Sequence, residues 1–271
     1  MTEIIVRAAG PGDIPGICRV NRGAEGPWAE YESCLDSVMT RLENGFYIQV
    51  AEINGLIVGH GEWVISDEPR RKTCYLGQLQ VDPDWQFCGV GRKMISNGVS
   101  FARAAGCSTV TLIPEQETHS EIFYEKCGFI RGDNILACSL AARPGTVNGE
   151  RTNLAPHSVV TELPFMFGLT QTASEHMWQV FNRPASWDTR QKDTLIGEGF
   201  CIQLGGWSKD SNAELLAWAL PEKAEEVIAA ALAFAHELGY PGLNFHFRPE
   251  WKQLFTGADI TTDNYEMYLR T

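Results

Sequence analysis

The residues that follow Val81 combine two glycines with the start of a predicted helix, an arrangement that can bind an anion. The segment reads Gln86-Phe87-Cys88-Gly89-Val90-Gly91-Arg92. Outward-facing N–H groups of such a loop, with the positive end of the helix dipole, favour a phosphate or pyrophosphate. Gly89 and Gly91 would let phosphates approach the backbone without an intervening Cβ. Arg92 either adds positive charge to this site or lies in solvent as an ordinary first-turn residue.

The elements around this loop predict an α/β domain. Asn54-Gly55 is typical of a tight hairpin between two strands. The periodicity of residues 90–105 predicts an amphipathic helix that ends at Gly106. Strands are expected at residues 3–8, 46–52, 56–66, 74–81, 109–113 and 134–140, and helices at 13–22, 34–42, 90–105 and 118–126. The glycine loop therefore joins a strand to the helix that follows it.

A stretch without periodicity, residues 142–153, is the natural domain boundary. We expect one domain over residues 1–144 and a second over 150–271. The second part predicts strands at 159–169, 200–207, 214–220, 242–247 and 265–270, and helices at 174–181, 221–238 and 249–255. Residues 101–107 align with 234–240, which indicates an internal duplication, with chance similarity between two α/β domains as the alternative.

Two motifs resemble signatures of the GNAT superfamily of acetyl-coenzyme A-dependent N-acetyltransferases. The glycine loop fits the pattern Q/R-x-x-G-x-G/A and follows Val81-Asp82-Pro83. Further on, Phe123-Tyr124-Glu125-Lys126-Cys127-Gly128-Phe129 resembles the second signature, a helix that carries a tyrosine and ends in Gly-Phe. The resemblance covers residues 3–141 and implies the GNAT fold, a mixed central sheet flanked by helices. The second half, which lacks the loop, is then a degenerate GNAT-like domain.

The resemblance also implies the contacts with acetyl-CoA. Backbone groups around Leu79 and Val81 would bond the pantetheine and polarise the thioester carbonyl. The pyrophosphate would contact Gln86, Phe87, Cys88, Gly89, Val90, Gly91 and Arg92. Tyr124 would touch the coenzyme and act as the general acid that protonates the departing thiolate, with simple packing as the alternative. Glu117 stands where the family often has an asparagine, so a coenzyme contact is in doubt there.

The general base is assigned less directly. An ammonium acceptor must lose a proton before its nitrogen can attack, and a carboxylate usually accepts that proton. Some family members carry a glutamate on a strand where this chain has Tyr75. Glu62, beside His60 on the preceding strand, is the substitute that we predict, and a structural carboxylate is the alternative. Glu25 and Glu30 are further candidates.

Composition excludes several other classes of function. The 22 Lys and Arg and 34 Asp and Glu give a net charge of −12, which opposes binding to nucleic acids and to anionic membranes. No signal-like start or membrane-length apolar run is found, so the sequence predicts a cytoplasmic protein. The eight cysteines form no C-x-x-C pair, so neither a disulfide framework nor a metal site is expected.

The resemblance implies an enzyme that transfers an acetyl group from acetyl-CoA to a primary amine of a small molecule or peptide. Polyamines, amino acids, aminoglycoside-like compounds and protein amines remain open as acceptors. A non-catalytic acyl-CoA sensor or interaction module is the alternative. An acyl-cysteine route through Cys88 or Cys127 has no nearby histidine to support it. A monomer and a homodimer are both compatible with the sequence.

Overall fold

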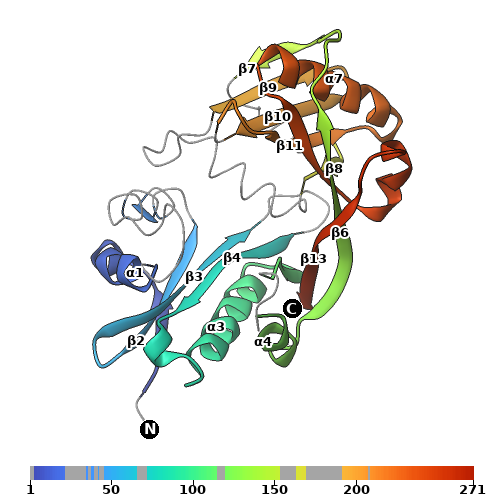
Figure 1. The fold of residues 1–271 in the computed structure, drawn as a ribbon. Coiled ribbons are helices and arrows are strands. Elements are labelled where there is room, and N and C mark those ends of the chain that lie inside the picture. Colours follow the sequence, from blue (N-terminus) through green and yellow to red (C-terminus); the bar gives the residue numbers. More distant parts are fainter. Residues whose placement is uncertain are drawn as a thin grey trace. The chain divides into compact units, whose positions relative to one another are not determined.

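The computed structural model describes residues 3–21, 46–65, 72–114, 120–152, 163–168, 191–206 and 208–271, with single positions at 35, 38, 39 and 42. These residues form two compact units (Figure 1). The first holds the described residues up to Ile130 together with residues 267–271, and the second holds those of 131–266. Among these residues, the first compact unit thus ends at Ile130 and resumes at Met267, and the division into domains 1–144 and 150–271 stays a prediction. Glu25, Glu30, Glu117 and the expected helix 174–181 lie outside the described residues.

The first unit is built on a mixed sheet. Its strands are β1 (Ile5–Ala8), β2 (Tyr47–Ile53), β3 (Leu56–Ile65), β4 (Thr73–Val81), β5 (Thr109–Leu112) and the end of β13 (Thr261–Arg270). Neighbours are antiparallel except β4 and β5, which are parallel. The helices are α1 (Ile14–Asn21), α3 (Val90–Ala104) and α4 (Ser120–Lys126), with 3-10 turns η1 (Pro11–Asp13) and η3 (Pro83–Trp85). The predicted mixed sheet with flanking helices is confirmed.

The strand that pairs with β5 comes from the far end of the chain. Residues 267–270 of β13 pair antiparallel with β5. The strand that directly follows α4, β6 (Ile130–Ala141), pairs instead with β12 (Gly242–Phe247) in the second unit. It begins four residues before the predicted start at 134. Each compact unit thus contains strand residues that sequence order would assign to the other half.

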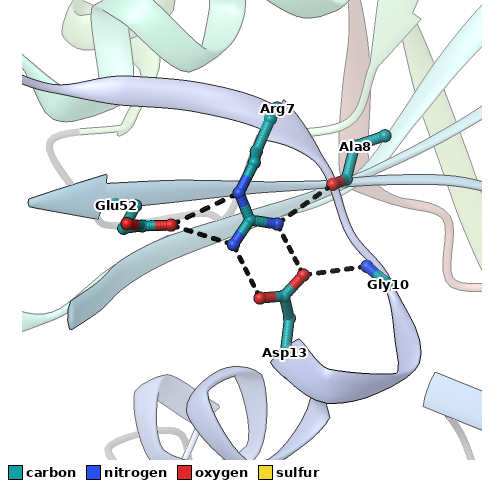
Figure 2. A network of polar contacts seen from close by, with 5 residues as sticks. All are labelled: Arg7, Ala8, Gly10, Asp13 and Glu52. Carbon is teal, nitrogen blue, oxygen red and sulfur yellow. Dashed lines mark hydrogen bonds and ion pairs between the residues drawn. The ribbon is translucent and has the colours of Figure 1, made fainter. Parts of the chain in front are cut away.

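Two packing arrangements fix α3 and α1 relative to the first sheet. Trp63 on β3 is fully buried, and a Cβ at Gly98 of α3 would lie only 1.9 Å from its ring. Arg7 on β1 donates hydrogen bonds to Asp13 at 2.6 and 2.8 Å and to Glu52 on β2 at 2.9 Å (Figure 2). This network joins β1 and β2 to the turn that precedes α1.

The second unit has a sheet and helices of its own. Its strands are β6, β7 (Glu150–Thr152), β8 (Phe165–Phe167), β9 (Gln191–Gly197), β10 (Phe200–Gly206), β11 (Ala213–Ala219) and β12. Helix α7 (Ala224–Glu237) follows the 3-10 turn η4 (Pro221–Lys223), and the expected helix 249–255 is the 3-10 helix η5 (Pro249–Phe255). β7 lies in the predicted linker, and β9 was not predicted because Gln191-Lys192-Asp193 reads as polar loop. Within the described ranges no helix has the length and apolar character needed to cross a membrane.

The two aligned segments, residues 101–107 and 234–240, end their helices in the same way. In α3, the N–H of Gly106 donates to Arg103 and that of Cys107 to Ala102, at 3.0 Å each. In α7, Gly239 donates to His236 at 3.1 Å and Tyr240 to Ala235 at 2.9 Å. Both glycines are left-handed, with φ of 80° and 82°. Because roughly a third to a half of all helices end in a left-handed residue, this shared ending does not test the internal duplication, which stays a prediction.

Candidate active site

The second half of β4 has a free edge in the described structure. Parallel pairing with β5 covers only Thr73–Tyr75, and β5 ends at Leu112. From Leu76 to Val81, β4 pairs with β3 on one side, and no described strand pairs with it on the other. Residues 77–81 are half-buried, whereas Thr73 and Cys74 are buried. Main-chain groups on this side of Leu79 and Val81 therefore have no strand partner among the described residues, and their contact with a coenzyme stays a prediction.

A bulge bends β4 where the two strands separate. Trp63 lies opposite Leu76 and Glu62 opposite Gln78, so Gly77 has no counterpart on β3. An extra residue of this kind bends the strand and increases its local twist. In the second unit, β10 and β11 pair without a shift from Phe200 to Gly205. The bulge is thus a difference between the two related sheets.

The turn after β4 is held by its own backbone and side chains. The Asp82 carboxylate accepts the N–H of Asp84 at 3.1 Å, and Trp85 donates to the carbonyl of Asp82 at 2.8 Å. The Gln86 side chain donates from Nε2 to the Val81 carbonyl at 3.2 Å. Phe87 has a positive φ of 60° and a fully exposed side chain. These contacts lead the chain from the edge of β4 directly to the start of α3.

Helix α3 begins without a side-chain cap. Its N-cap is Gly89, with φ of 88°, and no acidic residue lies in the first turn. The first-turn side chains Arg92 and Lys93 are instead exposed cations, which are unfavourable beside the positive end of a helix dipole. N–H groups of a first turn have no partner within the helix. The start of α3 therefore has the polarity of an anion site.

The structure favours glycine at positions 89 and 91 for different reasons. A Cβ at Gly89 would meet no atom within 4 Å, so its positive φ is what favours glycine there. A Cβ at Gly91 would lie 3.1 Å from the ring of Phe123 on α4. Gly91 therefore allows α3 to approach α4, a role that the sequence reading did not assign.

Tyr124 lies on α4 within a group of three aromatic side chains. Its ring packs edge-on against Phe123 at 5.2 Å and against Phe129 at 5.7 Å between centroids. Its carbonyl accepts the N–H groups of Cys127 and Phe129. Because Phe123 also packs beside Gly91, Tyr124 is held on the helix that borders the start of α3.

Glu62 and His60 occupy the sheet face opposite α3. Their β3 neighbours Gly59 and Trp63 point toward α3, so strand alternation places Glu62 and His60 on the other face. Glu62 is 2% exposed and His60 1% exposed. Glu62 lies opposite Gln78 and His60 opposite Gln80, both on the separated half of β4. The predicted base candidate is therefore next to the strand that carries Leu79 and Val81.

Gln78 and Gln80 were not singled out from the sequence. His60 Nε2 lies 3.2 Å from Gln78 Oε1, so these side chains form one polar group across two strands. In the sequence, Gln78 and Gln80 alternate with Leu79 and Val81, which indicates that they lie on one face of the strand. Only the register between β3 and β4 shows that this face also carries His60 and Glu62. Tyr75 lies in the part of β4 that pairs with β5.

The two cysteines considered as nucleophiles, Cys88 and Cys127, differ in their surroundings. Burial raises the pKa of the Cys127 thiol, and the nearby Arg92 lowers it only in part. Cys88 is exposed on the loop. Among the described residues, Cys18, Cys74, Cys107, Cys138 and Cys201 are buried and form no disulfide, as expected for small apolar side chains.

Comparisons with known proteins agree with this geometry. Residues 17–129 match the family model described as Acetyltransferase (GNAT) family. An uncharacterized N-acetyltransferase of Methanocaldococcus jannaschii is 33% identical over 97 residues, 34% of this chain. The match spans only 42% of that relative's length.

Two solved structures show the fold over nearly the whole chain. One, from Pyrococcus horikoshii and named as an acetyltransferase, has a TM-score of 0.65 at 18% identity and covers 99% of this chain and 89% of its own. A GCN5-related N-acetyltransferase from Kribbella flavida has a TM-score of 0.62 at 12% identity, with 98% and 71% covered. Residues 17–129 are therefore similar to the GNAT family of acetyltransferases, and the two solved structures share the fold of the chain.

Proposed function

We propose that the first unit transfers an acetyl group from acetyl-CoA to a primary amine, with both substrates bound together. The observation that carries this proposal is the direct connection of a separated strand edge at Leu79–Val81 to an uncapped helix start at Gly89. The edge offers main-chain groups to a pantetheine and a thioester. The helix start offers N–H groups and positive charge to a pyrophosphate.

A comparison with the second unit supports the assignment of the coenzyme to the first. Helix α7 follows Pro221, carries Glu225 and Glu226 in its first turn, and has Glu222 in the preceding 3-10 turn. Negative charge and a missing N–H at that place oppose anion binding. We therefore propose one acetyl-CoA per chain, in the cradle formed by residues 86–92.

The proposed reaction is direct attack. The amine nitrogen bonds to the thioester carbon, the carbon–sulfur bond breaks, and the coenzyme leaves as a thiolate. A main-chain N–H near Leu79 or Val81 polarises the thioester carbonyl. Glu62 accepts the first proton that the ammonium must lose, directly or through water, and Tyr124 donates a proton to the thiolate. The second proton, which the nitrogen loses as the amide forms, restores the Tyr124 hydroxyl. The acceptor is a small-molecule or peptide amine.

The first experiment tests the anion cradle by calorimetry with acetyl-CoA. Gly89→Glu places a carboxylate where the pyrophosphate would lie, and we expect it to abolish binding. Gly257→Glu is a matched control, because Gly257 has φ of 85° and, like Gly89, open space around its Cβ position. We expect the control to bind one acetyl-CoA per chain. Wild-type affinity in folded Gly89→Glu, or a stoichiometry near two, would contradict the proposal.

The second experiment tests catalysis. A panel of primary amines is supplied with acetyl-CoA, and the released thiol is measured. We expect turnover with at least one amine and none with the Gly89→Glu variant. Tight binding of acetyl-CoA without turnover across polyamines, amino acids and lysine peptides would indicate a sensor instead.

A further inference from the structure

A second feature of the first unit lies beside α3. A groove of about 620 Å³ runs between α3, the C-terminal end of α4 and the end of β13. Four cationic side chains line it, and its lining residues include no carboxylate. These cations are Arg92, Lys126, Arg103 and Arg270. Only Arg92 belongs to the coenzyme cradle proposed above.

The described residues form no ion pair that balances the charge of this groove. Elsewhere, Arg7 pairs with Asp13 and Glu52, and Arg248 pairs with Asp133 and Glu266. In the described part of the chain, none of the four groove cations forms an ion pair with a carboxylate. The chain as a whole carries a net charge of −12. A concentration of unneutralised cations on so acidic a protein favours an anionic ligand.

The cations are spread along the groove. Arg92 lies in the first turn of α3, close enough to Cys127 to influence its thiol. Arg103 lies in the last turn of α3, and Arg270 is opposite Thr109 at the start of β5. At about 1.5 Å per residue, Arg92 and Arg103 are roughly 16 Å apart along the helix axis. An extended peptide of about five residues spans that length.

The groove between the charged ends is aliphatic. Ile95 and Val99 line it from α3 and Leu269 from β13, and Ile130 beside them is 57% exposed. No aromatic ring is among the lining residues, so a nucleobase would have no stacking platform. This lining favours aliphatic side chains over a nucleotide as the neutral part of the ligand.

We propose that this groove binds an acidic peptide segment of a partner protein. Aliphatic side chains of the segment lie against Ile95 and Val99. Its carboxylates pair with Arg92 and Lys126 toward one end, and with Arg103 and Arg270 toward the other. The acidic segment is complementary to the groove cations, whereas the net negative charge of the protein opposes its binding elsewhere. Because the attraction is between charges, the affinity falls as salt is added.

The experiment measures fluorescence anisotropy of a labelled heptapeptide, Glu-Glu-Leu-Val-Leu-Glu-Glu, with the full chain at low ionic strength. We expect saturable binding that weakens about fivefold or more in the Arg103→Ser/Arg270→Ser double variant, as two exposed ion pairs would predict. Arg143→Ser removes an exposed cation outside the groove and should bind as the wild type does. Peptides with glutamine for glutamate, or serine for the aliphatic residues, should bind more weakly.

Several outcomes would overturn the proposal. These are an absence of saturable binding, equal affinity for the double variant, and equal affinity for the serine-substituted peptide. Full displacement of the heptapeptide by acetyl-CoA at the coenzyme's own dissociation constant would assign the groove to the coenzyme. Because Arg103 and Arg270 are exposed, the double variant should keep its circular dichroism spectrum and its acetyl-CoA affinity.

Discussion

Met267 on β13 lies opposite Leu112 on β5 in antiparallel register. Met267 is fully buried and Leu112 is 1% exposed. The sheet of the first unit is therefore continued by a residue that follows almost the whole of the second half in sequence. A chain cut after residue 144 would lack this pairing and expose the edge of β5, which favours aggregation.

Replacing this methionine tests the contribution of β13 to the first unit. We expect Met267→Ala to lower the free energy of unfolding by about 2–5 kcal/mol, because it removes a fully buried side chain. Denaturant titration gives the value. Thr262→Ala, at an exposed position of the same strand, should change the free energy by less than about 0.5 kcal/mol. Equal effects of the two substitutions would contradict the buried pairing.

Tyr124→Phe tests the general acid. The substitution keeps the ring that packs against Phe123 and Phe129 and removes only the hydroxyl. We expect kcat to fall by about 10²–10⁴, with little change in the affinity for acetyl-CoA. Steady-state kinetics and calorimetry give the two values. Wild-type kcat in the variant, with chemistry shown to be rate-limiting, would leave Tyr124 as a packing residue.

Cys88 should be the first of the described cysteines to be alkylated. It is exposed in the proposed cradle, whereas burial raises the pKa of Cys138 to about 11 and that of Cys201 to about 12. Thiolate is the reacting species, so the buried thiols react slowly. Peptide mapping after brief iodoacetamide treatment should find Cys88 modified, and acetyl-CoA should slow that modification at least about tenfold. Unchanged labelling at saturating acetyl-CoA would place the coenzyme elsewhere.

The Arg7 network predicts a dependence of stability on acid pH. Hydrogen bonds from Arg7 and from the Gly10 N–H hold the pKa of Asp13 below its usual value. A lowered native pKa stabilises the protein above the unfolded-state pKa of Asp, about 3.9, and this stabilisation is lost as pH falls through the native value.

Asp13→Asn isolates this contribution. At neutral pH we expect it to lower the free energy of unfolding by on the order of 1 kcal/mol, because Arg7 is partly exposed. The difference from wild type should shrink as pH falls below about 4. The exposed Asp259 provides a control, Asp259→Asn, with little effect at either pH. A deficit for Asp13→Asn that persists unchanged in acid would show that its origin is not the charge.

The sequence by itself determined the glycine loop and the elements beside it, because these depend on neighbours along the chain. Asn54 and Gly55 both have positive φ in the predicted hairpin, and Gly106 ends α3 where expected. The uncapped start of α3 follows from Gly89 alone. Likewise, the alternation of residues 74–81 was sufficient to predict a strand before the loop.

Only the tertiary structure decided which strands pair and what faces Glu62. A pattern of period two identifies a strand but not its partner, so the exchange of β6 and β13 between the two units was invisible in the sequence. The bulge at Gly77 sets which β4 side chains share a face with Glu62, and that register belongs to two strands together. The groove cations come from helices α3 and α4 and from β13. Residues so distant in sequence become neighbours only in the folded protein. Strand pairing and helix packing bring them together, and both act between separate elements rather than between neighbours along the chain.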